Sequence, residues 1–380
     1  MRDVIPGDEL LRKAHSVGQY YGFTPLSVLA SDTRGEKKTR QRPLPEVLSG
    51  LTLDPIAETV AGFLKQCKSA SIAPSAKLPL FIWHTNIAPG RPAPKRAVIQ
   101  FHAIGSDRAI ADAVVIRALS ALARDLYHED PVVRVNSMGD KETRARYARE
   151  LGNFFRKRAA LLPEDCVTCA KRDAIEAAEL VLKRAAASDV PSPTDYLSDA
   201  SRKRFEDLLE YLEETETPYE LARELLARGS AWHETCFEIM AGEKRVAWGS
   251  RYGELARLFF PSAHPAVGGA LMVATDGAKM PKPSLQRPRF SFVHIGDEAK
   301  HASIRLAEEF RKARVPLAQD IGVESLTEQL HLAERRNPPY LVIMGRKEAL
   351  EGSVILRNRA TQDESVLPVD GLADRLKTYA

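Results

Sequence analysis

Apolar residues recur at helical spacing in two long stretches in the first third of the chain. Leu11, Val17 and Tyr21 fall on one face of a helix predicted over residues 8–21. A longer and more strongly periodic pattern predicts a second helix over residues 109–126. Each helix therefore has an apolar face that needs burial against other elements.

Shorter apolar runs predict strands and one further helix. Residues 80–102 have the pattern of a strand, a loop and a returning strand, and residues 132–137 that of another strand. Pro261 ends the short apolar segment of residues 254–260. The apolar run that opens at Pro265 is predicted to form a helix to about Ala274.

Small and polar residues mark the connections. Residues 249–253, Gly-Ser-Arg-Tyr-Gly, are typical of a turn and allow a backbone to pass close to a neighbour. Residues 31–45 are polar and basic and predict a loop, and residues 188–193 predict a linker. The proline-rich residues 281–289 predict a boundary between two domains, residues 1–280 and 290–380.

After this boundary, strand and helix patterns alternate, which predicts a small α/β domain with helices packed on a sheet. The predicted strands are residues 290–295, 315–319, 340–344, 353–359 and 364–368. The predicted helices are residues 298–312, 323–336 and 371–379.

The composition is that of an ordinary globular protein. Of 380 residues, 44% are hydrophobic and 28% are charged, and the formal net charge is +4. This charge permits contact with nucleic acid without requiring it. The chain has no apolar run of the length a membrane helix needs and no apolar signal region at its start. Four cysteines give no disulfide framework, so we expect a cytoplasmic protein with no membrane contact.

Two segments carry a family resemblance. Residues 249–274 contain GSRYGEL and then HPAVGGALMVA, and residues 134–155 read RVNSMGDKETRARYARELGNFF. Their order and spacing resemble blocks of the histidyl-tRNA synthetases, a class II family, and the similarity extends from about Asp3 to Leu376. The resemblance implies an α+β fold, with an antiparallel sheet flanked by helices and a C-terminal α/β domain like the family's anticodon-binding domain. It also implies a homodimer.

The resemblance also points to residues of the substrate site. Arg228 aligns with the family arginine that acts in adenylate formation and is the only main charged residue retained. The positions that line the histidine pocket are occupied by Trp232 and His233, which either fill the pocket or simply pack. The other pocket-like residues are Gln100, His102, Arg251 and Tyr252.

Three family positions have lost the side chain that handles a charged reactant. Ile56 replaces the glutamate that takes the amino group of histidine, and an ammonium buried without a carboxylate is costly. Ala88 replaces the arginine that grips the α-phosphate, and Thr275 the arginine that holds the γ-phosphate. Arg91 or Arg96 are the residues that can substitute if the register differs by one position.

Four functions remain open from the sequence. The first is a catalytically inactive paralogue that binds tRNA, another RNA or a protein. The second is a working histidine–tRNA ligase with an altered site, which would use ATP and Mg²⁺. The third is a regulatory subunit like the paralogue that activates ATP phosphoribosyltransferase, although that paralogue typically lacks the C-terminal domain. The fourth is an enzyme that uses the old pocket for another small molecule.

Binding to RNA would depend on clustered basic residues, because the bulk charge is small. Cys166 and Cys169 form a lone CxxC, and a zinc site needs about four ligands, so no metal site is predicted. The basic clusters are residues 34–42, Arg91 with Lys95 and Arg96, residues 144–158, and Arg335, Arg336, Arg346, Lys347, Arg357 and Arg359.

Overall fold

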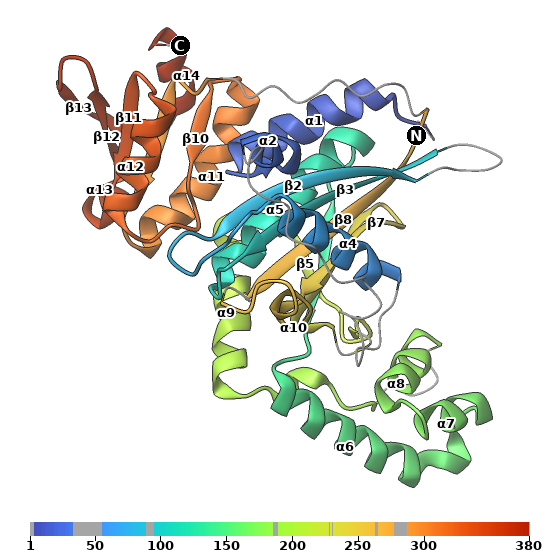
Figure 1. Cartoon of the computed structure of the whole chain (residues 1–380). Coiled ribbons are helices and arrows are strands. Elements are labelled where there is room, and N and C mark those ends of the chain that lie inside the picture. The colour runs from blue at the N-terminus through green and yellow to red at the C-terminus, as the bar shows by residue number, and fades with distance from the viewer. Residues whose placement is uncertain are drawn as a thin grey trace.

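The computed structural model contains two sheets with helices around them (Figure 1). It describes residues 4–32, 55–88, 95–184, 189–227, 229, 231–262, 265–276 and 287–379. The first sheet has eight strands and the second has five, and they share no strand. The α+β class is therefore confirmed. The boundary at residues 281–289 stays a prediction, because residues 277–286 lie outside the described part of the chain.

The first sheet is antiparallel at its centre and parallel at both edges. Long neighbouring strands from distant parts of the chain pair over up to ten residues, which fixes the faces of the sheet. In spatial order the strands are β1 (Thr24–Pro25), β2 (Leu80–Ala88), β3 (Lys95–Ile104), β8 (Ala266–Thr275), β7 (Lys244–Arg251), β6 (His233–Ala241), β4 (Val132–Ser137) and β5 (Tyr219–Leu221).

The predicted helix that begins at Pro265 is wrong, because Ala266–Thr275 is the strand β8. Both faces of β8 are largely covered, so its apolar residues do not alternate with polar ones, and an unbroken apolar run does not separate a buried strand from a helix. Glycine is needed at position 268 because the His102 ring lies against the backbone there: a Cβ on Gly268 would lie 2.1 Å from Nδ1 of His102.

The turn predicted at residues 249–253 begins later than expected. The strand β7 continues to Arg251, and the short helix α10 (Gly253–Arg257) follows. The close approach predicted for this stretch is present, since a Cβ on Gly249 would lie 2.2 Å from the ring of Phe237 and 2.6 Å from the carbonyl oxygen of Gly268.

One face of the first sheet is covered by the predicted long helix, α5 (Ala109–Tyr127), which packs on β3, β8 and β6. The N-terminal helix α1 (Gly7–Tyr20) and the helix α9 (Asp199–Glu214) pack against α5. Ile99, Phe101 and Leu271 point from the sheet into this core and are fully buried. Because α5 is apolar nearly all round, it forms the centre of the first domain.

The opposite face of the sheet meets α4 (Pro55–Ser69) and α10. Phe63 and Leu64 of α4 join Ile82 and Ile104 of the sheet in a second core cluster. The short helix α2 (Leu26–Asp32) contacts the edge strand β1 and its neighbour β2. This second face is the one on which the sequence-predicted site residues lie.

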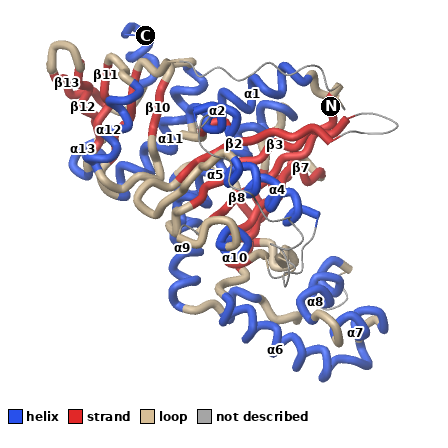
Figure 2. The backbone as a smooth tube through the Cα atoms, in the orientation of Figure 1, coloured by secondary structure: helices blue, strands red, loops and turns tan. Residues whose placement is uncertain are grey.

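Three helices extend away from the first sheet, as Figure 2 shows. They are α6 (Lys141–Arg158), α7 (Glu164–Ala170) and α8 (Ala174–Lys183). The side chains of Asp140 and Asp173 accept hydrogen bonds from the first backbone amides of α6 and α8 and so begin these helices. The predicted cap Ser198 does the same for α9.

The second sheet is mixed, with parallel pairs on one side and antiparallel pairs on the other. Its strands in spatial order are β10 (Leu317–Gln319), β9 (Phe290–His294), β11 (Tyr340–Met344), β12 (Ser353–Asn358) and β13 (Glu364–Pro368). The accompanying helices are α11 (Asp297–Ala313), α12 (Leu326–Arg336), α13 (Arg346–Glu351) and α14 (Leu372–Leu376). Only the short α13 was missed by the sequence pattern.

The two parts meet where α11 lies beside α1 and α5. Arg311 of α11 forms ion pairs of 2.7 Å with Asp125 of α5 and with Glu308. The Tyr21 hydroxyl donates a hydrogen bond of 3.1 Å to Glu308. Polar contacts of this kind fix the second domain against the first. None of the helices in the described ranges is long and apolar enough to cross a membrane.

The contact at Gly268 gives a direct test of the fold. Replacing Gly268 by Ala places a methyl group inside the His102 ring, so we expect the unfolding free energy to fall by about 3 kcal/mol, measured by urea denaturation. The matched control is Gly152→Ala in α6, where a Cβ meets nothing within 4 Å and raises helix propensity by up to about 1 kcal/mol. Equal effects of the two substitutions would contradict the packing described above.

Candidate functional site

The face of the first sheet that lies opposite α5 carries the predicted site residues. Residues in register on neighbouring strands point to the same face, and so do alternate residues along a strand. Gln100 and His102 of β3 therefore share this face with Ala270 and Gly268 of β8 and with Trp248 of β7.

His102 is the centre of a buried polar cluster. The Tyr252 hydroxyl lies 2.8 Å from its Nδ1, and Oε1 of Gln100 lies 3.2 Å from its Nε2. These contacts are satisfied together when Nε2–H donates to Gln100 and Nδ1 accepts from Tyr252, which is the neutral ring. Burial, with His84 as a smaller cause, lowers the pKa of His102 to about 3 and agrees with this assignment.

Phe63 of α4 closes this cluster from above. Its ring is stacked on His102 with 3.9 Å between ring centroids and 12° between planes. Gln100 is 2% exposed and His102 is 1% exposed. The His102 ring is thus satisfied by Gln100 and Tyr252 beneath an aromatic cover.

Trp232 and His233, which replace the residues of the pocket, both pack. Trp232 is buried and lies edge-on to Trp248, with 4.8 Å between ring centroids, and to Tyr252 at 6.4 Å. His233 begins β6 and pairs with Arg251 of β7. Burial first, and then Arg251, lowers the pKa of His233 to about 3. Both side chains therefore contribute to packing, and a role in filling a ligand pocket stays a prediction.

Arg251 does not join the His102 cluster. Its Nε lies 3.0 Å from both carboxylate oxygens of Asp112, and its Nη2 donates 2.8 Å to the carbonyl oxygen of Arg108. Asp112 is fully buried in the first turn of α5. The pair ties β7 to the start of α5, so Arg251 has a structural role.

Arg228 lies outside the described residues, but its neighbours are held firmly. Arg144 of α6 donates to the carbonyl oxygens of Ala227 at 3.2 Å, Trp232 at 2.8 Å and Gly229 at 2.9 Å. The sequence placed Arg144 in a basic cluster for RNA, and that placement is wrong, because its guanidinium is engaged by backbone.

Of the three substituted family positions, Ile56 lies against the core cluster of this face, whereas Thr275 alternates with Ala270 and Ala274 along β8 and lies on the α5 side. Ile56 is half-buried near the start of α4 and packs against the second core cluster. The backbone of Ala88 pairs with Arg96 at the far end of β2, and the side chain of Ala88 lies outside the described residues. Thr275 is buried at the end of β8, opposite Lys95. None of the three offers a charge to a ligand.

The end of the face near Ala88 is more open. Met272 is 48% exposed although it lies on a central strand, and Val98 and Trp248 are only half-buried. Arg96 is exposed and stands in register between Ala88 and Ala274 on this face. Arg91 lies outside the described residues. Arg96 is thus the described cation best placed to meet a ligand here.

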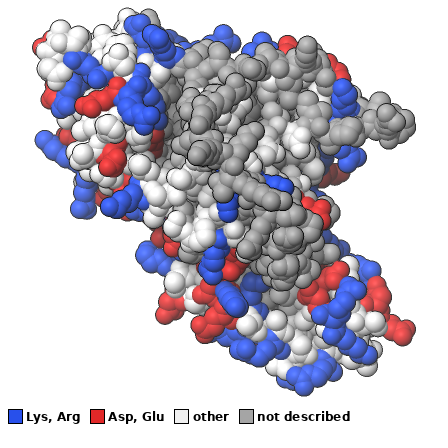
Figure 3. Space-filling model, viewed as in Figure 1, with Lys and Arg blue, Asp and Glu red and all other residues white. Residues whose placement is uncertain are grey.

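Contacts within the chain engage several of the arginines that were predicted to bind RNA. Residues 34–42 lie outside the described ranges, and five arginines are engaged in contacts within the chain. Arg158 pairs with Asp189, Arg336 with Asp320, Arg346 with Glu298 and Arg357 with Glu364, and Arg359 bonds to Asn337. In Figure 3, basic and acidic side chains are interspersed over the helical extension and the C-terminal domain. Exposed basic residues without an ion pair to a described residue include Lys95, Arg96, Arg149, Lys157, Arg335 and Lys347.

Cys166 and Cys169 both lie on α7 as free thiols, and Cys166 is buried. Within the described ranges, no group of three or more His, Cys, Asp and Glu side chains is close enough to hold a metal ion.

The sequence interpretation missed three residues that shape this site. They are Phe63, Asp112 and Arg144, which are not among the pocket residues that the sequence predicts. Asp112 had a usable signal, because a lone carboxylate in a strongly apolar helix needs a buried partner. Phe63 had none, since an apolar residue on an amphipathic helix does not reveal what it covers.

The C-terminal part of the chain has a recognisable family signature. Residues 291–379 match the family described as the anticodon binding domain. This range contains the second sheet and its helices.

Comparisons over most of the chain point the same way. The chain is 28% identical over 297 residues to the histidine–tRNA ligase of Geobacillus sp. (strain WCH70), covering 74% of this chain and 70% of that protein. It is 27% identical over 286 residues to the histidine–tRNA ligase of Caldanaerobacter subterraneus subsp. tengcongensis, covering 72% and 68%. The apo histidyl-tRNA synthetase of S. aureus aligns over 99% of this chain and 98% of its own, with 17% identity and a TM-score of 0.46, which is too low to assign a fold.

Three buried histidines predict how stability depends on pH. Burial, aided by Lys300, lowers the pKa of His294 to about 3, as it does for His102 and His233. The unfolded chain takes up protons near the ordinary pKa of about 6.5 and the folded chain does not, so stability is present above that pH and is lost as the pH falls. We expect each histidine to lower the unfolding free energy by about 1.4 kcal/mol per pH unit between roughly pH 6.5 and 5.

Urea unfolding at several pH values measures this dependence. His294→Leu removes one of the three groups and should make the pH slope shallower; no described residue hydrogen-bonds to its ring nitrogens. His331→Gln, at an exposed position, is the control and should leave the slope unchanged. A slope that His294→Leu does not change would contradict the burial of these rings as the cause.

Proposed function

Because the chain belongs to the histidyl-tRNA synthetase family of class II, we propose that it is a catalytically degenerate member that binds tRNA without charging it with histidine. The observation that carries the proposal is the closed cluster at His102. Gln100 and Tyr252 satisfy the His102 ring, and Phe63 covers it. A histidine substrate would have to break these contacts to enter.

The substituted positions support the same proposal. The glutamate that the family uses for the substrate ammonium is Ile56 here, and the two phosphate-binding arginines are Ala88 and Thr275. Losing one such electrostatic contact typically lowers the rate by about 10²–10³. Among the described residues, the printed neighbours of the His102 ring are Gln100, Tyr252 and Phe63, and none of them is an acid that could replace the lost glutamate. Three losses at separate positions therefore favour a binding function.

Transfer RNA is the partner that the domain composition favours. Residues 291–379 match the anticodon binding domain, and Lys95 and Arg96 are exposed at the end of the first sheet. Arg335 and Lys347 supply exposed positive charge on the C-terminal domain. A partner that touches both domains would receive cations from each, which is how a phosphate backbone is held.

A second candidate is a histidine–tRNA ligase with an altered site, using ATP and Mg²⁺. One observation favours it: Arg96 stands beside Ala88 in register on the open part of the face. A phosphate at this end would meet Arg96 in place of the missing arginine. In this candidate, Arg228 keeps the role in adenylate formation that the resemblance implies.

Two further expectations stay predictions. The resemblance implies a two-fold homodimer, which light scattering of the full chain would test. It also leaves open a regulatory subunit of ATP phosphoribosyltransferase, or a different protein partner, as the physiological assembly.

Catalytic silence is the first test of the proposal. We expect no histidine-dependent exchange of pyrophosphate into ATP above the background without enzyme, because Ile56 cannot hold the substrate ammonium and Ala88 and Thr275 cannot hold the phosphates. The assay is run with an active histidine–tRNA ligase as the positive control. Exchange that is abolished by Arg96→Ala or Arg228→Ala, and kept by Arg149→Ala on the exposed side of α6, would instead establish the second candidate.

Binding of tRNA is the second test. We expect a dissociation constant in the micromolar range at low salt, of the order found for non-specific nucleic-acid contacts, with affinity that falls as salt is raised. The double substitution Lys95→Ala and Arg96→Ala should weaken binding roughly tenfold by removing two phosphate contacts, measured by filter binding.

The matched control removes Arg202 and Lys203, an exposed basic pair on α9 that lies away from the sheet end. It should bind tRNA like the unaltered chain. Absence of tRNA retention at low salt, or retention that salt does not change, would leave a protein partner as the better account.

A further inference from the structure

A cavity lies between the two domains, away from the His102 cluster. It has a volume of about 630 Å³, which is within the range of small-molecule sites. Its walls come from α5, from the turn after α9, from α11 and from the start of α14. The side chains that matter below are Arg117 and Arg124 of α5, and Arg305, Glu308 and Lys312 of α11.

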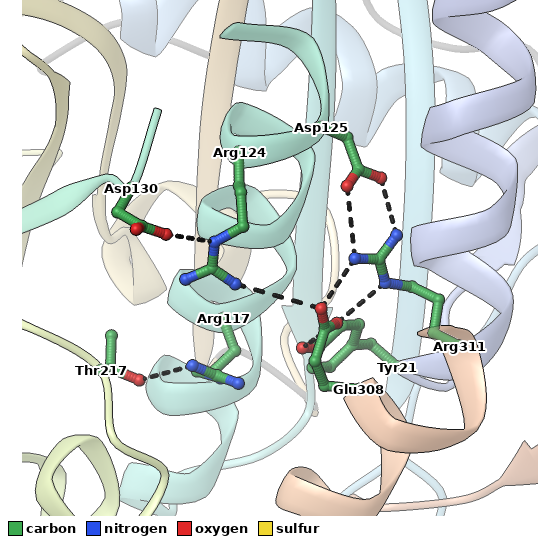
Figure 4. Close-up of polar contacts among 8 residues, drawn as sticks. All are labelled: Tyr21, Arg117, Arg124, Asp125, Asp130, Thr217, Glu308 and Arg311. Atoms are coloured by element: carbon green, nitrogen blue, oxygen red, sulfur yellow. Dashed lines mark hydrogen bonds and ion pairs between the residues drawn. The ribbon is translucent and has the colours of Figure 1, made fainter. Parts of the chain in front are cut away.

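Most charges around this cavity are matched by partners (Figure 4). Glu308 accepts hydrogen bonds from Tyr21 and from Arg311, and Arg311 also holds Asp125. Nε of Arg124 donates a hydrogen bond of 2.9 Å to Asp130. Arg305 lies 4.0 Å from Glu309. These groups form a self-consistent network that joins α1, α5 and α11.

Arg117 is the exception. It is 7% exposed, and it donates one hydrogen bond, 2.9 Å from Nη1 to the Thr217 hydroxyl. Its Nε is buried and has no hydrogen-bond partner, and no carboxylate in the described residues forms an ion pair with it. Figure 4 shows its side chain reaching from α5 toward Thr217, apart from the Glu308–Arg311 network.

Thr217 does not supply the missing charge. Its hydroxyl lies 3.0 Å from that of Thr215, which donates 2.6 Å to the carbonyl oxygen of Tyr211. The hydroxyls thus form a chain in which Thr217 accepts from Arg117 and donates to Thr215. A guanidinium stays protonated at any ordinary pH, and burying it without an anion is costly.

We propose that this interdomain cavity binds a small anion through Arg117, namely a carboxylate or phosphate group of a small molecule. The guanidinium offers its remaining N–H donors to two oxygens of such a group, which is the geometry that arginine favours. Lys312, which is exposed on α11 and forms no ion pair with a described residue, adds a second positive charge from the other domain.

The charge of the lining limits the size of the anion. Four basic and five acidic side chains line the cavity, so a polyanion such as a nucleoside triphosphate would face net repulsion. A single carboxylate or phosphate can be held at Arg117 while the exposed acids Glu216 and Asp370 remain in water. Because α5 and α11 belong to different domains, the bound anion would hold the C-terminal domain in place.

The test uses the full chain with inorganic phosphate and with acetate, each compared with chloride at constant ionic strength. We expect saturable binding of at least one of the two anions by calorimetry, and a matching rise in melting temperature, since ligands that bind only the folded state stabilise it. Preference for acetate indicates a carboxylate ligand, and preference for phosphate indicates a phosphate ligand.

Two variants locate the site. Arg117→Gln should lower the affinity about tenfold or more, while Lys312→Gln, at an exposed position that does not threaten folding, should lower it about threefold. Arg149→Gln on α6 is the control and should bind like the unaltered chain. The proposal is overturned if neither anion binds saturably, or if Arg117→Gln and Lys312→Gln both bind as tightly as the unaltered chain.

Discussion

The first domain depends on the close contact between the His102 ring and the backbone of Gly268. The ring occupies the volume that a Cβ on residue 268 would need. This allows β3 and β8 to pair over ten residues while the ring stacks beneath Phe63 and bonds to Tyr252. With the ring in this position, α4 can lie directly over the sheet. The same contact that completes the core therefore also places the predicted pocket residues His102 and Tyr252 beneath Phe63.

Two arginines near this core, Arg251 and Arg144, are bound to other groups of the chain and stabilise the fold. Arg251 is used by Asp112 at the start of α5, and Arg144 is used by three carbonyl oxygens of residues 227–232. Removing one partner of a buried pair such as Arg251–Asp112 typically costs about 3–5 kcal/mol. Such residues resist change for structural reasons. Arg251 and Arg144 are therefore explained by folding without any reference to a bound nucleotide.

The sequence predicted the order and type of most elements because their periodicities are distinct. The helix at residues 109–126 and the alternating C-terminal elements were correct, since their apolar residues recur at helical or strand spacing over the length of each element. It failed at residues 266–275, where burial on both faces erased the alternation. The candidate site was predicted only in part. Gln100, His102 and Tyr252 do meet, whereas Arg251 leaves the group, because a sequence does not show to which side of a strand end a long side chain turns. The cover by Phe63 and the unpaired Arg117 depend on contacts between distant segments and had no local signal.

Residues 5–7 are hydrogen-bonded to the end of β8 and the residue after it, and this affects how the chain folds during synthesis. The amide of Ile5 donates 2.9 Å to the carbonyl oxygen of Ala274, and the amide of Gly7 donates 3.1 Å to Asp276, which lies 269 residues further along. On a ribosome that adds about 5–20 residues per second, the first helix therefore waits roughly 15–50 s for the strand that receives it. During that interval the apolar face of α1 has only part of its final cover. Chaperones that shield nascent chains would find a binding site on this helix, because the strand that anchors it is synthesised about 270 residues later.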